Sequence, residues 1–535
     1  MDNKQVANIR ESLFKAHQKF ATSTSKTNIE ELFAADPERI SSHTIDIHQI
    51  HFDYSKALLN AESRELLFEL CKACGIEDAI KSMFAGEKIN TSENRSVLHT
   101  ALRDLHSRES KPEVLDTLNK IENFVSSVRE GRRTSSDNKK IKTVVNIGIG
   151  GSDLGPALVV DALNQFHEKD IDVRFVSNLD PSHLKRTLQL VDPQTTLFII
   201  ASKSFSTLET LANANAAKTW LLEKGIKSVS VSKHFAAITN NPGFASDFGV
   251  ERDCIFPMWD WVGGRFSLWS AIGLPIALAV GYKNFLDLLC GAHAADMHFY
   301  EAPLDKNIPV IMAILTYWYR EYFQAGSTAV IPYSQDLALF PSYLQQLSME
   351  SLGKSVTRDG EEVKGKTGDV IWGSSGTNGQ HSYFQLLHQG TEFIPIEFIA
   401  VVNPAPGIDT DQHSKLLANC IGQSFALIRG NNQNKNSSRH SPGSRPSNTL
   451  LLYQLDPFSL GSLLALYEHK IFALSVLWDV NAFDQWGVEF GKETAKEIYK
   501  EFEKEGGPET DEYDQSTQEL LKIIKKWSSK KKNEA

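Results

Sequence analysis

Short apolar runs alternate with longer segments of helical periodicity through the middle of the chain. Runs of this length, rich in β-branched residues and separated by helical segments, predict parallel sheets that are covered by helices on both faces. The first set of predicted strands comprises residues 143–149, 173–177, 196–201 and 228–232, and the second comprises 327–332, 369–372, 393–402 and 449–453. We therefore expect two doubly wound α/β domains of similar design.

The patterns on either side of these runs set the expected domain limits. Residues 1–115 are predicted to be mainly helical and to pack on the larger domain, and the smaller α/β domain is expected at 116–290. The larger α/β domain is expected at 291–500, followed by a charged helical tail at 501–535.

The longest apolar run, at residues 308–319, is too short to cross a bilayer and is followed directly by Arg320 and Glu321. It predicts a buried helix, so no membrane partner is expected.

Composition narrows the functional classes. A chain of 535 residues with 41% hydrophobic residues is long enough for two cores. The net charge of -10 argues against a general nucleic-acid binder, because phosphate contacts need a basic surface. The N-terminal sequence lacks the apolar region of a secretory signal, and five scattered cysteines suit a reducing compartment. We expect a cytoplasmic protein.

Two pairs of cysteine or histidine residues have short spacings like those of metal ligands, but neither pair completes a metal-binding motif. Cys71 and Cys74 form a C-x-x-C pair, but no second pair or nearby histidine completes a zinc site. His48 and His51 lack the glutamate and the helical spacing of a zinc protease motif. We interpret all four as structural and predict no metal site.

A glycine-rich loop, NIGIGGSDLGP (146–156), follows the first predicted strand and leads into a helix expected to start near Leu154. Its glycines let a phosphate or hydroxyl approach the backbone N–H groups, and a helix N-terminus favours negative charge. The spacing of Gly148 and Gly150, with Asp153 after them, does not complete the dinucleotide motif G-x-G-x-x-G.

A second polar loop, ASKSFSTLET (201–210), opens a helix after another buried strand. Its short donors are typical of a site for a phosphate monoester. The candidates are Ser202, Lys203, Ser204, Ser206 and Thr207. Alternatively, Ser206 and Glu209 form a capping box, and some of the hydroxyls only cap the helix.

The stretch QQLSMESLGK (345–354) carries a candidate base, Glu350. On a helix, Gln346 and Lys354 would share its face, one turn before and one turn after it. An ordinary surface pair between Glu350 and Lys354 is the alternative. Arg265 follows two glycines and could reach an oxyanion with two hydrogen bonds, although a structural salt bridge is the default interpretation of such an arginine.

Further candidates lie nearer the C-terminus and the N-terminus. His381 follows a flexible Gly-Gln step and is a better acid/base candidate than His388, which lies in an apolar run. Residues 483–495 supply Gln485 and Lys492 and alone would pass for a solvated helix. The basic residues flanking His99, Arg95 and Arg103, would either approach a phosphate or support an interface.

Together these segments closely resemble the glucose-6-phosphate isomerase family, also called phosphoglucose isomerase. The likeness is carried, from about residue 90 to residue 492, by IGIGGSDLGP, SKSFSTLET, DWVGGRFSLWSAIG, MESLGKS, GTNGQHSYFQLLHQG, ALYEHK and AFDQWGVEFGK. The resemblance implies two sugar isomerase domains and reversible isomerisation of D-glucose 6-phosphate and D-fructose 6-phosphate through a cis-enediol, in glycolysis and gluconeogenesis. It implies no metal and no other cofactor.

The resemblance also implies roles for individual residues. Glu350 would move the proton between C2 and C1, Arg265 would stabilise the charge of the intermediate, and His381 and Lys492 would serve ring opening. The implied substrate-binding residues are Gly151, Ser152, Ser202, Lys203, Ser204, Thr207, Gln346 and Gln485. In this family the equivalent of His381 comes from the neighbouring subunit, which implies a homodimer.

The sequence departs from the family pattern in a few places. Leu352 stands where the family commonly has Asn, Ser204 replaces a frequent Thr, and residues 430–447 form an Asn/Ser-rich loop. Two alternatives are carried forward: a dual isomerase that also accepts mannose 6-phosphate, and a non-catalytic sugar-phosphate sensor. Sensors of this kind usually carry a DNA-binding module, and the sequence offers no basic helix-turn-helix candidate.

Overall fold

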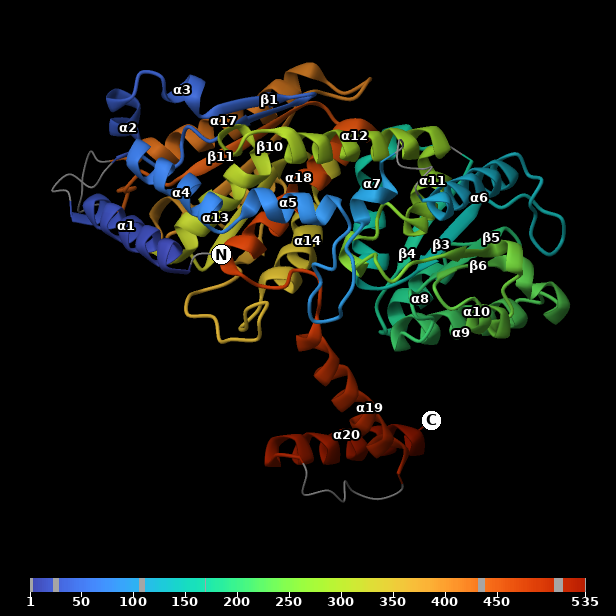
Figure 1. Ribbon diagram of the computed structural model, residues 1–535. Coiled ribbons are helices and arrows are strands. Elements are labelled where there is room, and N and C mark those ends of the chain that lie inside the picture. The colour runs from blue at the N-terminus through green and yellow to red at the C-terminus, as the bar shows by residue number, and fades with distance from the viewer. Residues whose placement is uncertain are drawn as a thin grey trace. The chain divides into compact units, whose positions relative to one another are not determined.

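The computed structural model describes residues 3–22, 28–104, 111–168, 170–431, 438–504 and 513–534. The chain divides into two units, Met1–Phe483 and Asp484–Ala535. The first unit holds two separate sheets, each with helices packed around it (Figure 1). The mixed α/β class expected from the sequence is therefore confirmed.

The smaller sheet has five strands, all parallel, in the order β4-β3-β5-β6-β7. They are β3 (Thr143–Ile147), β4 (Asp172–Val176), β5 (Thr196–Ala201), β6 (Phe235–Thr239) and β7 (Ile255–Pro257). Every residue of β3, β5 and β6 is buried, as expected for parallel strands covered on both faces. The helices of this part of the chain are α6 (Pro112–Arg129), α7 (Leu154–Ala162), α8 (Pro181–Leu188), α9 (Leu208–Glu223), α10 (Pro242–Phe248) and α11 (Leu274–Val280).

The larger sheet has six strands in the order β1-β2-β11-β10-β8-β9. Its parallel strands are β8 (Ser327–Tyr333), β9 (Val370–Trp372), β10 (Ile396–Asn403) and β11 (Ser447–Gln454). An antiparallel hairpin, β1 (Thr44–Ile47) and β2 (Ile50–Asp53), extends the sheet beside β11. The hairpin was not predicted, because each strand is only four residues long and lies among helices.

One predicted strand is wrong. Residues 228–232 alternate serine and valine with the period of a strand, but they begin a 3-10 helix, η5 (Ser228–His234). Val229 is 88% exposed, so this stretch does not bury a continuous apolar face. The strand is instead β6, directly after it, and the three-residue β7 was not predicted at all.

Long apolar helices form the core beside the larger sheet. They are α12 (Tyr282–Glu301), α13 (Ile308–Tyr322) and α18 (Pro457–Trp478), and the predicted buried helix at 308–319 is confirmed as part of α13. Within the described residues, α18 is the one helix long and apolar enough to cross a membrane, and it is wholly buried inside the protein.

The N-terminal segment adds α1 (Asn3–Thr22), α2 (Ile29–Ala35), α3 (Arg39–Ser42), α4 (Ala61–Ala73) and α5 (Ile76–Phe84). Cys71 on α4 and Cys74 at its C-cap are buried free thiols, so the structural interpretation of this pair is confirmed. Of the Asn/Ser-rich loop, residues 432–437 lie outside the described residues. The second unit contains α19 (Glu489–Glu503) and α20 (Gln515–Glu534).

A buried ionic cluster joins α12 and α18 to the 3-10 helix η1 (His99–Leu102). The guanidinium of Arg103 donates to both carboxylate oxygens of Asp296, at 2.5 and 2.7 Å, and to Glu468 at 2.5 Å. Trp269 and His469 complete the hydrogen bonds of the two carboxylates. Burial alone would raise the pKa of Asp296, but Arg103 outweighs it and the pKa is lowered to about 2. Arg103 therefore supports an internal contact and does not approach a phosphate.

Replacing Arg103 tests how much this cluster stabilises the fold. Arg103→Met would leave two buried carboxylates without their cation, so we expect the free energy of unfolding to fall by about 3–5 kcal/mol. Arg132→Met is the control, because Arg132 pairs with Glu130 at the surface and its loss should cost less than about 1 kcal/mol. Urea unfolding of both variants measures the difference, and equal small effects would contradict a structural role for the cluster.

Candidate active site

The glycine-rich loop lies at the carboxyl end of β3. From Ile147 the chain passes through a short 3-10 helix, η3 (Gly150–Ser152), and α7 begins at Leu154 as predicted. A Cβ atom on Gly151 would lie 2.0 Å from the carbonyl oxygen of Gly264, so only glycine permits this approach. A Cβ atom on Gly150 would lie 2.9 Å from Nε2 of Gln346. The loop thus contacts both the segment that carries Arg265 and the helix that carries Glu350.

The hydroxyl-rich loop lies at the carboxyl end of the neighbouring strand, β5. The next helix, α9, begins at Leu208, and its N-cap residue Thr207 makes no side-chain capping bond. The capping box predicted as an alternative is wrong, because this start places Glu209 at the second position of the helix instead of the third. The hydroxyls contact one another instead, with Ser202 donating to Thr207 over 3.2 Å and Ser204 lying 2.7 Å from Ser206.

Lys203 connects this loop to the segment before Arg265. Its Nζ donates to the carbonyl oxygens of Val262 at 2.9 Å and Asp260 at 3.2 Å. Burial lowers the pKa of Lys203, and Arg95 lowers it further, while Asp260 acts in the opposite direction. A half-buried ammonium group beside several hydroxyls is a suitable partner for an anionic group.

Glu350 lies at the end of a π-helix, η11 (Gln345–Glu350), which follows α14 (Phe340–Leu344). Its Oε2 accepts a hydrogen bond from Nε2 of Gln346 at 3.1 Å. The same oxygen forms an ion pair with Nη1 of Arg265 at 3.2 Å. The helical stretch ends at Leu352, so Lys354 does not lie one helical turn after Glu350. The carboxylate of Glu350 faces Arg265, and the predicted alternative of a surface pair with Lys354 is wrong. π-helical turns often occur at functional sites.

The guanidinium of Arg265 is fixed by further hydrogen bonds beside this ion pair. It belongs to the 3-10 helix η7 (Gly264–Phe266), and its side chain is only 2% exposed. Nε donates to the hydroxyl of Ser351 at 2.6 Å, and Nη2 donates to the carbonyl oxygen of Ala482 at 2.5 Å. Neither partner was identified from the sequence, although Ser351 directly follows Glu350.

This arrangement has a clear chemical capacity. A carboxylate is a suitable base for a hydrogen on the carbon next to a carbonyl group, because a cation close by stabilises the oxyanion that forms. Glu350 retains 22% of its side-chain exposure, so a ligand can reach it, while Arg265 is fixed in position before the ligand arrives.

One acidic residue within the glycine-rich loop was not singled out as a candidate from the sequence. Asp153 lies between η3 and α7, and its Oδ1 is buried without a hydrogen-bond partner among the described residues. Burial raises the pKa of Asp153 to about 6, against the opposing hydrogen bond from Ser177. In the sequence, Asp153 is marked only by standing where the dinucleotide motif would have its third glycine.

The other predicted residues belong to elements other than η7, η11 and the two loops. His381 is exposed and follows α15 (Gly376–Gln380), whereas His388 on α16 (Phe384–Gln389) is hydrogen-bonded to Gln423 at 2.8 Å. Gln485 and Lys492 belong to the second unit, where Lys492 pairs with Glu489 at 3.0 Å. Leu352, the departure from the family pattern, is completely buried.

Comparison with known proteins identifies the family of the chain. The sequence profile of the phosphoglucose isomerase family matches residues 53–521. The chain belongs to the phosphoglucose isomerase family. It is 46% identical over 523 residues to a glucose-6-phosphate isomerase of Francisella tularensis, covering 93% of this chain and 97% of that protein. It is 48% identical over 503 residues to one of Shewanella baltica, covering 89% of this chain and 92% of that protein.

A solved member of the phosphoglucose isomerase family has the same fold. The crystal structure of a glucose-6-phosphate isomerase from Chlamydia trachomatis superposes with a TM-score of 0.85 at 33% identity, covering 96% of this chain and 98% of that chain. The expectation of two sugar isomerase domains in an α/β fold is therefore confirmed for this chain.

The contact between the glycine-rich loop and η7 can be tested with two alanine variants. Gly151→Ala places a methyl group against the backbone of Gly264, so we expect a loss of about 1–3 kcal/mol in the free energy of unfolding. Gly264→Ala is the matched control, since a Cβ there meets no atom within 4 Å and should change stability by less than about 0.5 kcal/mol. Urea unfolding distinguishes them, and a stable Gly151→Ala variant would disprove the close contact.

Proposed function

We propose that this chain interconverts D-glucose 6-phosphate and D-fructose 6-phosphate through a cis-enediol, as a step of glycolysis and gluconeogenesis. The observation that carries the proposal is the ion pair of Glu350 with the buried Arg265, beside the glycine-rich loop. Membership of the phosphoglucose isomerase family supports it. The relatives named above favour neither a dual isomerase nor a sugar-phosphate sensor.

In the proposed mechanism the protein binds the phosphate group of the substrate at one end and transfers a proton between C2 and C1 at the other. Ser202, Lys203, Ser204 and Thr207 hold the phosphate, Gly151 and Ser152 lie close to the sugar, and Gln346 and Gln485 position it. After ring opening by His381 and Lys492, Glu350 removes the proton from C2 and returns it to C1. The charge that develops on the oxygen is stabilised by Arg265. Since the proton moves only between the substrate and Glu350, the chemistry requires neither a metal nor a redox cofactor.

Glu350→Gln tests the role of the base. The amide keeps the shape of the side chain but cannot accept the C2 proton, so kcat should fall by about 10²- to 10⁴-fold. Fructose 6-phosphate should still bind, because the phosphate contacts remain. A coupled assay measures kcat and calorimetry measures binding, with Glu361→Gln, an exposed carboxylate, as the control. An unchanged kcat would reject the mechanism, and wild-type protein that binds the sugar without converting it would favour the sensor.

We also propose a homodimer in which His381 completes the active site of the neighbouring subunit. The exposure of His381 supports this arrangement, because an exposed imidazole on one copy is available to another. A cytoplasmic location, with no nucleic-acid or membrane partner, remains part of the proposal. The domain limits 1–115, 116–290, 291–500 and 501–535 likewise stay a prediction.

Mixing two inactive variants tests the shared site. If His381 acts across the interface, a dimer of one Glu350→Gln chain and one His381→Ala chain contains one intact site. The isolated mixed dimer should then show roughly half of wild-type activity. Co-expression with two different affinity tags isolates the mixed dimer for assay. Should the mixed dimer be as inactive as either parent, His381 acts within its own chain or not at all.

A further inference from the structure

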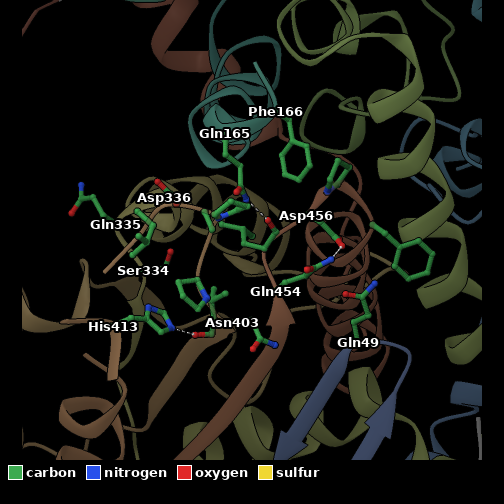
Figure 2. A pocket seen from close by; sticks show the side chains of 18 of the residues that line it. Gln49, Gln165, Phe166, Ser334, Gln335, Asp336, Asn403, His413, Gln454 and Asp456 are labelled. Carbon is green, nitrogen blue, oxygen red and sulfur yellow. Dashed lines mark hydrogen bonds between the residues drawn. The ribbon is translucent and has the colours of Figure 1, made fainter. Parts of the chain in front are cut away.

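A pocket of about 890 Å³ opens at the carboxyl edge of the larger sheet (Figure 2). Residues 334–336 after β8, 403–406 after β10 and 454–456 after β11 line it. Two of its carboxylates are paired within the protein, because Asp336 accepts from Asn164 at 2.9 Å and Asp456 accepts from Gln454 at 2.6 Å. None of the residues proposed above for catalysis or substrate binding lines the pocket, so it is separate from the candidate active site.

A smaller pocket, of about 290 Å³, borders the segment that holds Arg265. Its lining includes Asn481, Ala482 and Phe483, which follow the end of α18. The carbonyl oxygen of Ala482 accepts the hydrogen bond from Nη2 of Arg265. Because a cavity lies against this segment, close packing on that side cannot fix the direction of the carbonyl group. Hydrogen bonds must therefore define the path of the backbone here.

The side chain of Asn481 supplies those hydrogen bonds. Its Oδ1 accepts from the backbone N–H of Phe483 at 3.0 Å, which closes a tight bend around Ala482. Its Nδ2 donates to Oδ1 of Asn90 at 2.9 Å and to the hydroxyl of Ser92 at 3.0 Å. Asn481 is 7% exposed, so losing these partners would leave buried polar groups unsatisfied. The bend that presents Ala482 to Arg265 is thus tied to a segment almost 400 positions earlier in the chain.

That earlier segment is a closed turn. Asn90 and Arg95 exchange two backbone hydrogen bonds, at 3.1 and 3.2 Å. Inside the turn, Nδ2 of Asn90 donates to Oε2 of Glu93 at 2.7 Å, and Arg95 pairs with the other carboxylate oxygen of Glu93 at 3.3 Å. The turn therefore holds the side chain of Asn90 in one place, ready to meet Asn481.

The chemistry of the partners determines which way each amide points. A carboxylate can only accept, so Asn90 must turn its NH₂ group to Glu93 and its oxygen to Asn481. A backbone N–H can only donate, so Asn481 must turn its oxygen to Phe483 and its NH₂ group to Asn90. Reversing either amide would bring two acceptors or two donors together. The four groups form a hydrogen-bond chain with a single allowed direction.

We propose that Asn481 is a positioning residue for Arg265, acting through the carbonyl group of Ala482. Glu93 and Asn90 set the orientation of the Asn481 side chain, and its bond to Phe483 sets the bend at Ala482. A guanidinium that is fixed before the substrate binds stabilises a developing oxyanion without reorganisation. This inference rests on the proposed isomerase function and adds to it a residue that acts on Arg265 without touching the substrate.

Asn481→Asp tests the role of the amide. The new carboxylate still accepts from Phe483 but faces the oxygen of Asn90, which cannot reverse because Glu93 also accepts only. We expect kcat to fall about 10- to 100-fold as Arg265 shifts. Binding of 5-phospho-D-arabinonohydroxamate, whose charged end resembles the enediolate, should weaken by about tenfold or more. D-arabinitol 5-phosphate lacks that charge and should bind within about twofold of the wild type.

Adding Glu93→Gln to Asn481→Asp should rescue the activity. The introduced amide can donate to the oxygen of Asn90 and still accept from Arg95, so Asn90 reverses and donates to the new carboxylate. The direction of the whole chain is then inverted and every group is again paired. We expect kcat of the double variant to return to within about threefold of the wild type, an interaction that the double-mutant cycle measures directly.

Asn307→Asp is the matched control. Asn307 is completely buried, donates to the carbonyl oxygen of Phe299 at 2.8 Å and accepts from the N–H of Val310 at 3.4 Å. The same substitution therefore removes a buried donor and keeps the acceptor at the start of α13, among none of the residues proposed for the site. Urea unfolding should show a loss of stability, while kcat and hydroxamate binding stay unchanged.

Ser92→Ala is a milder variant in case Asn481→Asp does not fold. It removes one of the two acceptors of Asn481, and kcat should fall several-fold. The inference is overturned if the folded variants keep wild-type kcat, if the double variant is no more active than Asn481→Asp, or if both ligands weaken equally. Wild-type protein without isomerase activity would contradict the proposed function alone, and the two ligands would still test the position of Arg265.

Discussion

The guanidinium of Arg265 is the constraint around which the candidate active site is assembled. A buried charge is costly unless it is paired and hydrogen-bonded, and three separate parts of the chain come together around Arg265 to meet that requirement. They are η7 itself, the end of the π-helix with Glu350 and Ser351, and the segment at Ala482. Because Gly151 packs directly on Gly264, the same requirement also fixes the glycine-rich loop. Glu350, Arg265 and the glycine-rich loop are therefore positioned by one contact network.

The two sheets show how one topology serves different chemistry. Both place their loops at the carboxyl ends of corresponding strands. In the smaller sheet the loop after β5 offers hydroxyls and the ammonium group of Lys203, which suits a phosphate. In the larger sheet the loop after β10 offers prolines beside carboxylates, which does not. The fold supplies the position of a site, and the loop residues decide which ligand it accepts.

Much of the fold could be predicted because buried parallel strands are continuous apolar runs, as in β3 and β5. The prediction missed the short hairpin β1–β2, where this apolar signal is absent. It was wrong at η5, where serine and valine alternate with the period of a strand. For the site, the motifs identified Glu350 and Arg265, but local sequence could not reveal that Ser351 and Ala482 hold the arginine. Those contacts join residues far apart in the chain, so they depend on tertiary packing that no short motif contains.

Two buried arginines in the first unit show how the surroundings of an ion pair can differ between a structural role and a proposed catalytic one. Arg103 is enclosed by two carboxylates, and all three side chains are at most 1% exposed, so the charges neutralise one another where no ligand can enter. Arg265 is almost as deeply buried, but it forms an ion pair with the carboxylate of Glu350, which stays 22% exposed. The carboxylate of Glu350 is therefore accessible to solvent, whereas the two carboxylates around Arg103 are not. The exposure of the acidic partner, more than the burial of the arginine, distinguishes the two ion pairs, and it fits the catalytic role proposed for Glu350.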